Sequence, residues 1–173
     1  MTLALVRHGR TAWNRERRLQ GRTDIALDDH GRVQADAAGR LLARAPWTRL
    51  VCSPLVRAVE TARIVGGHLG LPHVLDPALV ERDFGAAEGM AVAAAAETWP
   101  DGDYPGSETW SELSARAHEA LTRQLRRGGD TVVVAHGTVL RAGIEAIVGG
   151  RCPRLLNGQV VLLDGTTAQV VEG

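Results

Sequence analysis

Two short apolar runs of this sequence each end directly in a histidine and a glycine. Leu3–Val6 is followed by Arg7-His8-Gly9, and Thr131–Ala135 is followed by His136-Gly137-Thr138. Short runs that are rich in β-branched residues and bounded by glycine and polar residues are typical of buried strands. Open α/β sheets bind their ligands beyond the carboxyl ends of such strands. If the strands are parallel, both histidines therefore lie at the edge of the sheet where a ligand is expected.

The rest of the chain alternates short apolar runs with helical patterns. Leu50–Ser53 predicts another strand, and Pro54 after it favours a helix with Ser53 as N-cap and Arg57 in its first turn, ended by glycines at 66, 67 and 70. We expect further helices over about 28–45, 90–99, 107–127 and 139–148, and a short helical turn within 11–21. Asp28 or Asp29 would cap the first of these helices, and Ser107 or Glu108 would open the third. A brief strand is expected at 74–75, and a hairpin of 160–163 with 168–171. This alternation predicts an α/β fold, a three-layer α/β/α sandwich with a mostly parallel central sheet, in one domain over residues 1–173.

The composition argues against several kinds of partner. The chain has 173 residues, and its 20 basic and 20 acidic side chains cancel, so we expect neither nucleic acid nor an anionic membrane as a partner. No apolar run approaches the length of roughly 18 residues that a transmembrane helix needs. All 20 basic residues are arginines, so an anion site must be built from guanidinium groups, which suit bidentate phosphate binding.

The cysteines and the N-terminus indicate in which cellular compartment the protein is expected. Cys52 and Cys152 are too few for a disulfide framework or for a four-ligand zinc site, and we expect both to be reduced packing residues. The N-terminus lacks a charged segment followed by a long apolar stretch, so no signal peptide is expected. The sequence therefore favours a cytoplasmic protein.

Three predicted strand-to-helix junctions contain candidate catalytic residues. The first junction contains Arg7 and His8, the second contains Arg57, and the third contains His136. Two arginines beside two histidines repel one another unless an anion lies between them, which indicates a phosphate site. Neutral His8 is a candidate nucleophile that would form a phosphohistidine, and Gly9 would let the backbone approach the ligand. A carboxyl group must then protonate the leaving oxygen and activate water. The candidates are Glu81, Glu88 and Asp83, and their spacing does not decide among them.

Four blocks along nearly the whole chain carry a resemblance to a known family. They are Arg7-His8-Gly9-x-Thr11 with Trp13-Asn14 and Gln20-Gly21, then Ser53-Pro54-Leu55-x-Arg57-Ala58-x-Glu60-Thr61-Ala62, then Glu81-x-x-Phe84-Gly85-x-x-Glu88-Gly89, and finally Val134-Ala135-His136-Gly137. In this order they resemble the histidine phosphatase superfamily, in the branch of the cofactor-dependent phosphoglycerate mutases and their small phosphatase relatives. The resemblance implies a phosphoglycerate mutase-like fold.

The resemblance also implies a role for each matched residue. His8 would be the phosphorylated nucleophile and Glu81 the proton donor, while Arg7, Arg57 and His136 would bind the phosphoryl group and stabilise its charge. The residues expected to bind substrate are Gly9, Asn14, Gln20, Gly21, Gly137 and Thr138. Glu60 and Glu88 are expected to be structural, and neither a metal ion nor a cofactor is implied.

Some residues depart from the family pattern. Arg10 stands where an acidic residue is common, which would add positive charge near the mouth of the site. Ala86 and Ala87 replace a polar and aromatic pair that often precedes the Glu-Gly of the third block. Neither departure removes a catalytic group, but both bear on the identity of the substrate. The arginine-rich segment 15–22 would favour a substrate with a second anionic group.

The function favoured by these residues is that of a metal-independent phosphomonoesterase, a histidine acid phosphatase-type phosphoric monoester hydrolase that acts on a small phosphorylated metabolite. A phosphoglycerate mutase-type phosphoryl transfer is the alternative, although a mutase must exclude water from its phosphoenzyme, which needs a more enclosed pocket than this length indicates. A catalytically idle phosphate-binding regulatory module is a third hypothesis, and the intact set of charged residues argues against it. The adjoining arginines disfavour a metal hydrolase. An exposed edge strand in the tail is a surface through which two copies could pair as a homodimer.

Overall fold

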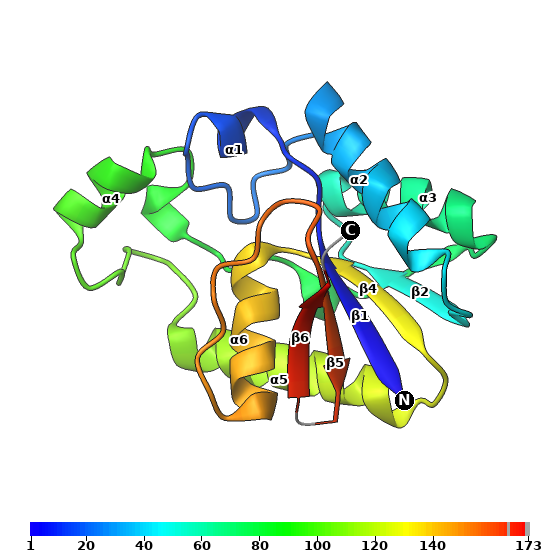
Figure 1. Ribbon diagram of the computed structural model, residues 1–173. Coiled ribbons are helices and arrows are strands. Elements are labelled where there is room, and N and C mark those ends of the chain that lie inside the picture. The colour runs from blue at the N-terminus through cyan, green and yellow to red at the C-terminus, as the bar shows by residue number, and fades with distance from the viewer. Residues whose placement is uncertain (166, 172–173) are drawn as a thin grey trace.

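The computed structural model describes residues 1–165 and 167–171. Within these ranges, six strands form one sheet in the order β3-β2-β4-β1-β5-β6 (Figure 1). The strands are β1 (Thr2–Arg7), β2 (Arg49–Cys52), β3 (His73–Leu75), β4 (Thr131–Ala135), β5 (Val160–Asp164) and β6 (Thr167–Val171). β1 to β4 are mutually parallel, and β5 is antiparallel to both of its neighbours, β1 and β6. The predicted mostly parallel sheet is therefore confirmed.

Helices cover both faces of this sheet. They are α1 (Ala12–Arg15), α2 (Asp29–Leu42), α3 (Val56–Leu69), α4 (Val92–Thr98), α5 (Trp110–Arg126) and α6 (Gly137–Val148), and single 3-10 turns occur at Pro77–Leu79 and Gly85–Ala87. Side chains alternate between the two faces of a strand, so Leu3 and Leu5 of β1 pack with α5 and α6, whereas Ala4 and Val6 pack with α2 and α3. The molecule is thus a three-layer α/β/α sandwich, as predicted.

The ends of several helices differ from the expectation. The helix predicted after Pro54 is α3, which begins at Val56 with Leu55 at the N-cap and without a side-chain cap. The Ser53 hydroxyl accepts the Leu55 N–H at 3.3 Å, in the turn before the helix, and also contacts His136. The helix continues through the first two of its three glycines and ends only at Gly70, whose φ is 65°. The long helix α5 begins two to three residues later than expected, because Thr109 forms a capping box with Glu112. Asp28 caps α2 as predicted.

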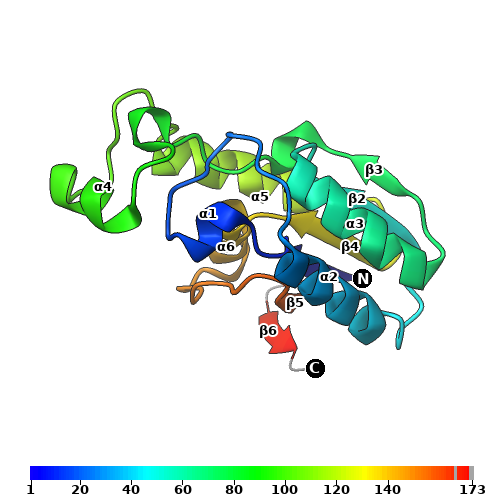
Figure 2. The ribbon, with the colours of Figure 1, turned by 90° about the horizontal axis from the view of Figure 1, so that it is seen from above.

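A small third cluster of apolar side chains lies beyond the sheet and carries α4. Phe84, Ala87 and Ala95 are its buried members, and Leu19, Met90, Trp99 and Tyr104 pack against them. Figure 2 shows α4 projecting away from the sheet, with α1 between them. A β-bridge from Arg18 to Ala91 ties the segment after α1 to the segment before α4. This cluster supplies one wall of the cavity described below. None of the described helices combines the length and the apolar character needed to cross a membrane.

Candidate active site

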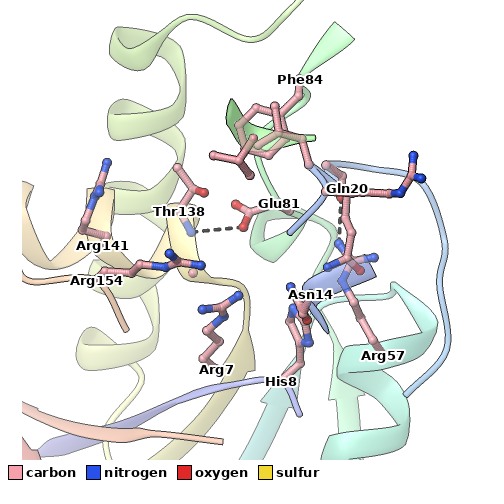
Figure 3. A pocket seen from close by; sticks show the side chains of 15 residues that line it. Arg7, His8, Asn14, Gln20, Arg57, Glu81, Phe84, Thr138, Arg141 and Arg154 are labelled. Atoms are coloured by element: carbon pink, nitrogen blue, oxygen red, sulfur yellow. Dashed lines mark hydrogen bonds between the residues drawn. The ribbon is translucent and has the colours of Figure 1, made fainter. Parts of the chain in front are cut away.

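A cavity of about 210 Å³ opens at the carboxyl ends of the parallel strands (Figure 3). The register of β1 with β4 pairs Arg7 with Ala135, so His8 and His136 follow at the same height, as the two sequence junctions predict. The residues that line the cavity are Arg7, His8, Asn14, Arg18, Leu19, Gln20, Gly21, Arg57, Glu81, Phe84, Val92, Gly137, Thr138, Arg141 and Arg154. Most of the predicted site residues are therefore brought together in one place.

His8 lies at the base of the cavity with a defined tautomer. Its backbone N–H donates to the Ala135 carbonyl, which keeps the residue attached to β4, and its side chain is 3% exposed. The Nδ1 atom lies 2.7 Å from the Gly9 carbonyl oxygen, which accepts only, so Nδ1 carries the proton and Nε2 carries the lone pair. Burial, together with the positive charges of Arg57 and Arg7, holds the pKa of His8 well below its ordinary value. His8 is therefore a neutral imidazole with a free Nε2.

His136 lies behind His8 rather than on the cavity surface. The two ring centroids are 5.1 Å apart, and His136 is fully buried. Its Nδ1 accepts from Arg57 Nε at 3.2 Å, and its Nε2 donates to Ser53 Oγ at 2.7 Å. Burial is the main cause of a pKa well below the ordinary histidine value, and Arg57 adds to it. The donor of Arg57 thus sets the tautomer of His136, and Ser53, which sequence reasoning had assigned to a helix cap, accepts the proton on Nε2.

Arg57 is 1% exposed and joins the site to the loop in front of it. Its two terminal nitrogens donate to the carbonyls of Thr23 (2.9 Å) and Gly21 (2.7 Å), while Nε donates to His136. Each terminal nitrogen keeps a second N–H for another acceptor. Burial lowers the pKa of Arg57, and the negative charge of Glu81 opposes this. The guanidinium thereby fixes the loop and presents donors to the cavity.

Arg7 ends β1 with part of its guanidinium unpaired. One terminal nitrogen donates to the Leu155 carbonyl at 2.6 Å, and the buried Nε–H has no hydrogen-bond partner within residues 1–165 and 167–171. Burial lowers the pKa of Arg7 to about 10, so the side chain remains cationic at neutral pH. A buried donor without a partner costs free energy unless a ligand satisfies it. Arg7 is therefore set to receive an anion.

Glu81 faces the two arginines from the other side of the cavity. It lies in the segment after Pro77–Leu79 and is 7% exposed. Its Oε1 accepts the backbone N–H groups of Arg82 (2.8 Å) and Val139 (3.0 Å), and its Oε2 accepts that of Thr138 (3.0 Å). The last two donors belong to the first turn of α6, whose orphan N–H groups favour a carboxylate. Of the three carboxyl groups that spacing left open, Glu81 alone lines the cavity.

The segment after β1 supplies the polar rim. Thr11 caps α1 and donates its hydroxyl proton toward Gln20 Oε1 at 2.9 Å, which orients the Gln20 side chain. Asn157 donates to the Asn14 side chain at 3.1 Å and to the His8 carbonyl at 3.0 Å. Gly21 has a φ of 55°, and a Cβ there would clash with the Glu88 carboxylate. These contacts hold Asn14, Gln20 and Gly21 at the cavity.

Other predicted residues lie elsewhere. Gly9 does not line the cavity. Its close approach is to the backbone of Gly31 in α2, where a Cβ would not fit, so its role in packing replaces the expected approach to a ligand. Arg10 is paired with Asp28 at 2.8 Å and adds no free charge to the mouth. Glu88 accepts the backbone N–H groups of residues 22 and 23, and Glu60 pairs with Arg32, which agrees with the structural roles expected for both.

Six further residues line the cavity, and four of them had no signal that sequence reasoning used: Leu19, Val92, Arg141 and Arg154. The other two, Arg18 and Phe84, belong to the arginine-rich segment 15–22 and to the third family block. Leu19, Phe84 and Val92 form an apolar side contributed by the third cluster and α4, and Arg18, Arg141 and Arg154 add cations. Arg141 follows the last predicted block by one helical turn, a spacing that places it on the same face of α6 as Gly137 and Thr138. Within the described residues, no group of three or more histidine, cysteine, aspartate or glutamate side chains is placed to hold a metal ion. The arrangement suits an anion.

Comparisons with known proteins show the family of the chain. A family model described as the histidine phosphatase superfamily (branch 1) matches residues 3–170. An uncharacterized phosphatase of Bacillus subtilis strain 168, PhoE, is 39% identical over 150 residues, which are 86% of this chain and 78% of that protein. A probable phosphoglycerate mutase of Klebsiella pneumoniae, GpmB, is 35% identical over 158 residues, covering 84% of this chain and 74% of that protein.

A solved structure agrees with the fold. The structure of a mycobacterial glucosyl-3-phosphoglycerate phosphatase with VO3 superposes with a TM-score of 0.88 and covers 98% of this chain and 96% of that one. Its sequence is 24% identical to this chain, so the likeness supports the fold alone. The predicted phosphoglycerate mutase-like fold is confirmed.

Proposed function

The chain belongs to branch 1 of the histidine phosphatase superfamily, and from this premise we propose that it is a metal-independent phosphomonoesterase acting through a phosphohistidine on His8. Membership in the family and a phosphatase-named relative support phosphatase activity on small phosphorylated substrates. The nucleophile, the intermediate and the independence from metals are the proposal. It treats residues 1–173 as one histidine phosphatase domain. A cytoplasmic location and a homodimer remain predictions from the sequence.

In the first half-reaction the lone pair of His8 Nε2 attacks phosphorus. A nitrogen–phosphorus bond forms while the bond from phosphorus to the ester oxygen breaks, and the leaving oxygen takes a proton from the carboxyl group of Glu81. Arg7 and Arg57 donate to the phosphoryl oxygens and stabilise the charge that develops on them. His136 holds the guanidinium of Arg57 in place through its Nδ1. The Gly9 carbonyl, bonded to Nδ1–H, stabilises the positive charge that the His8 ring acquires.

In the second half-reaction the ionised Glu81 takes a proton from a water molecule. The water oxygen attacks phosphorus, the nitrogen–phosphorus bond breaks, and His8 regains its lone pair as phosphate leaves. Glu81 Oε2 accepts one backbone N–H, from Thr138, and retains a lone pair for this proton. Atoms and charges balance over the two steps without an ion or cofactor.

One observation carries the proposal. The imidazole of His8 is buried and neutral, and its bond to the Gly9 carbonyl leaves Nε2 as the atom with the lone pair. Two guanidinium groups with unused donors lie around that nucleophile in the same cavity. A surface histidine has neither the defined tautomer nor the cationic surroundings. This combination supports nucleophilic attack on a phosphoryl group.

The test measures phosphate release from a panel of phosphomonoesters in the presence of EDTA. We expect His8→Ala to lower kcat/KM on the order of 10³-fold or more, because it removes the nucleophile itself. His118→Ala, which changes an exposed histidine on α5, should leave the rate unchanged. A rapidly quenched wild-type reaction should contain an acid-labile, base-stable phosphoprotein that His8→Ala lacks.

Other results would lead to other functions. Loss of activity on adding EDTA would point to a metal hydrolase. Interconversion of 2-phosphoglycerate and 3-phosphoglycerate without net release of phosphate would favour the mutase. The similarity to the probable phosphoglycerate mutase keeps this alternative open. Silence in both assays would leave the phosphate-binding module as the remaining hypothesis.

A further inference from the structure

Two arginines of the cavity have no part in the proposed chemistry. Arg141 of α6 and Arg154 of the segment between α6 and β5 both line the cavity, on the side of Arg7 and Thr138 and across from Asn14 and Arg57 (Figure 3). Neither one forms an ion pair or a side-chain hydrogen bond with another described residue. A buried polar group normally has a hydrogen-bond partner, and the buried Nε–H of Arg141 has none among the described residues. A ligand in the cavity could supply that partner.

Arg141 is held in a defined position. It lies one helical turn beyond Thr138 and thus on the face of α6 that borders the cavity. Its guanidinium carbon lies 5.0 Å from the centre of the Trp110 ring, at the start of α5. Its buried Nε–H has no hydrogen-bond partner in the part of the chain that the structure describes. Stacking that fixes the plane of a guanidinium while leaving its donors unused prepares it to bind an anion.

Arg154 is placed by its neighbour in the chain. The carbonyl of Leu155 accepts from Arg7 at 2.6 Å, so the backbone next to Arg154 is tied to the end of β1. The side chain of Arg154 is exposed, yet it is close enough to Arg7 for its charge to lower the pKa of that guanidinium. The two arginines Arg141 and Arg154 therefore extend the cationic side of the cavity outward from Arg7.

The charges of the cavity do not balance with a phosphate alone. Arg18 is matched by Glu16 at 2.9 Å, which leaves Arg7, Arg57, Arg141 and Arg154 as the cations that line the cavity. Glu81 is neutral when the ester is bound, because in the proposed mechanism it holds the proton for the leaving oxygen. A phosphate dianion at His8 then neutralises two of the four positive charges. Two positive charges remain, those of the outer pair, Arg141 and Arg154.

We propose that Arg141 and Arg154 form a subsite for a second anionic group of the substrate. The preferred substrates are then small phosphomonoesters with a carboxylate or a second phosphate a few atoms from the ester oxygen. This inference rests on the proposed phosphatase function and deepens it. It also replaces the expectation from segment 15–22, because Arg18 is paired with Glu16, and Arg22 lies 3.5 Å from Asp83.

The test uses pairs of esters that match in length and differ in charge. Phosphooxy carboxylates with chains of two to four carbon atoms are compared with the hydroxyalkyl phosphates of the same length, and alkanediol bisphosphates supply a second phosphate instead. Phosphate release gives kcat/KM for the wild type, Arg141→Gln and Arg154→Gln. Arg151→Gln is the matched control, because it changes an exposed arginine of the same segment that does not line the cavity.

We expect the wild type to prefer the anionic member of at least one pair by about tenfold to a hundredfold, the range of one or two charged hydrogen bonds. Arg154→Gln, at an exposed position, should abolish the preference by lowering kcat/KM on the anionic ester far more than on the neutral one, whereas Arg151→Gln should keep the wild-type preference. Arg141→Gln should do the same. A larger preference for the phosphooxy carboxylates would identify the second anion as a carboxylate, and a larger preference for the alkanediol bisphosphates would identify it as a phosphate. An equal rate on both members at every length, or a preference that survives both substitutions, would overturn the subsite.

A failure of the phosphatase itself has a different signature. If the wild type hydrolyses neither series, the proposed function is wrong, and calorimetric titration of His8→Ala with the same pairs decides the subsite separately. Tighter binding of the anionic ester that is lost in His8→Ala/Arg154→Gln supports the subsite, and equal binding of the two esters contradicts it.

Discussion

The two histidines of the site are kept neutral by the residues around them. His8 and His136 are buried, and Arg57 and Arg7 lie beside them, so both pKa values are held well below the ordinary range. A protonated imidazole could not act as a nucleophile, because its lone pair would be occupied. The arginines that bind the phosphoryl group in the proposed mechanism therefore also keep the nucleophile active.

This neutrality predicts how stability depends on pH. In the unfolded chain each histidine titrates near pH 6.5, whereas in the native state it stays neutral, so below that pH the unfolded state binds protons that the native state does not. The native state therefore loses free energy of unfolding as pH falls below about 6.5, until the folded pKa is reached. For His8 alone the loss is roughly 1 kcal/mol between pH 7 and pH 5.5.

Urea unfolding at the two pH values measures this loss. His8→Gln should lose roughly 1 kcal/mol less than the wild type over the interval. His30→Gln, which changes an exposed histidine of α2, should follow the wild type. An identical pH dependence in His8→Gln and in the wild type would show that His8 is not held neutral by the fold.

At the scale of elements, the site depends on how closely α2 approaches the end of β1. A Cβ added at Gly9 would clash with the Gly31 carbonyl, and one added at Gly31 would clash with the backbone of Arg10. The two backbones therefore touch at the point where the chain leaves His8. Since the Nδ1–H of His8 donates to the Gly9 carbonyl, this contact also positions the nucleophile.

A pair of glycine substitutions tests the contact. Alanine in a helix is normally favoured over glycine by roughly 0.5–1 kcal/mol, and Gly67 of α3 has open space around it, so Gly67→Ala should stabilise the protein. Gly31→Ala should instead destabilise it by about 1–3 kcal/mol, because overpacking moves the backbone, and it should lower kcat. The measurement is the free energy of unfolding together with the rate. Stabilisation of similar size in both variants would refute the role assigned to this contact.

At the scale of the whole molecule, one cavity collects cations from separate segments of the chain. Arg7 ends β1, Arg57 begins α3, Arg141 lies in α6 and Arg154 precedes β5. The fold brings these charges together although they repel one another. An anion in the cavity relieves that repulsion, and it binds the native state but not the unfolded chain.

Inorganic phosphate should therefore raise the melting temperature. At a phosphate concentration a hundredfold above its Kd the gain is about 2.7 kcal/mol, which corresponds to roughly 5–10 °C for a chain of this size. Differential scanning calorimetry in phosphate and in chloride of equal ionic strength measures it. Arg7→Gln should reduce the shift, and Arg151→Gln should retain it. Equal shifts in phosphate and chloride would mean that no specific anion site exists.

Local sequence patterns predicted much of this structure. The apolar runs before His8 and His136 are strands, the segments between them are helices, and the tail is a hairpin, because burial and periodicity decide these features within a few residues. Family blocks pointed to the residues that now surround the cavity, including Glu81 among three candidate acids. Helix ends were less accurate, since α3 has no side-chain cap and the Ser53 hydroxyl bonds in the turn before it and to a distant residue.

The contacts between residues far apart in the chain were determined only by the tertiary structure. Ser53 reaches His136 only because β2 lies beside β4, and Gly9 is required at its position only because α2 crosses there. Arg141 and Arg154 belong to no motif, and they join the site because α6 and the segment after it are packed against the end of β1. Local sequence can specify strands, helices and reactive groups, but the partners of a side chain depend on the order of strands in the sheet and on the packing of its layers.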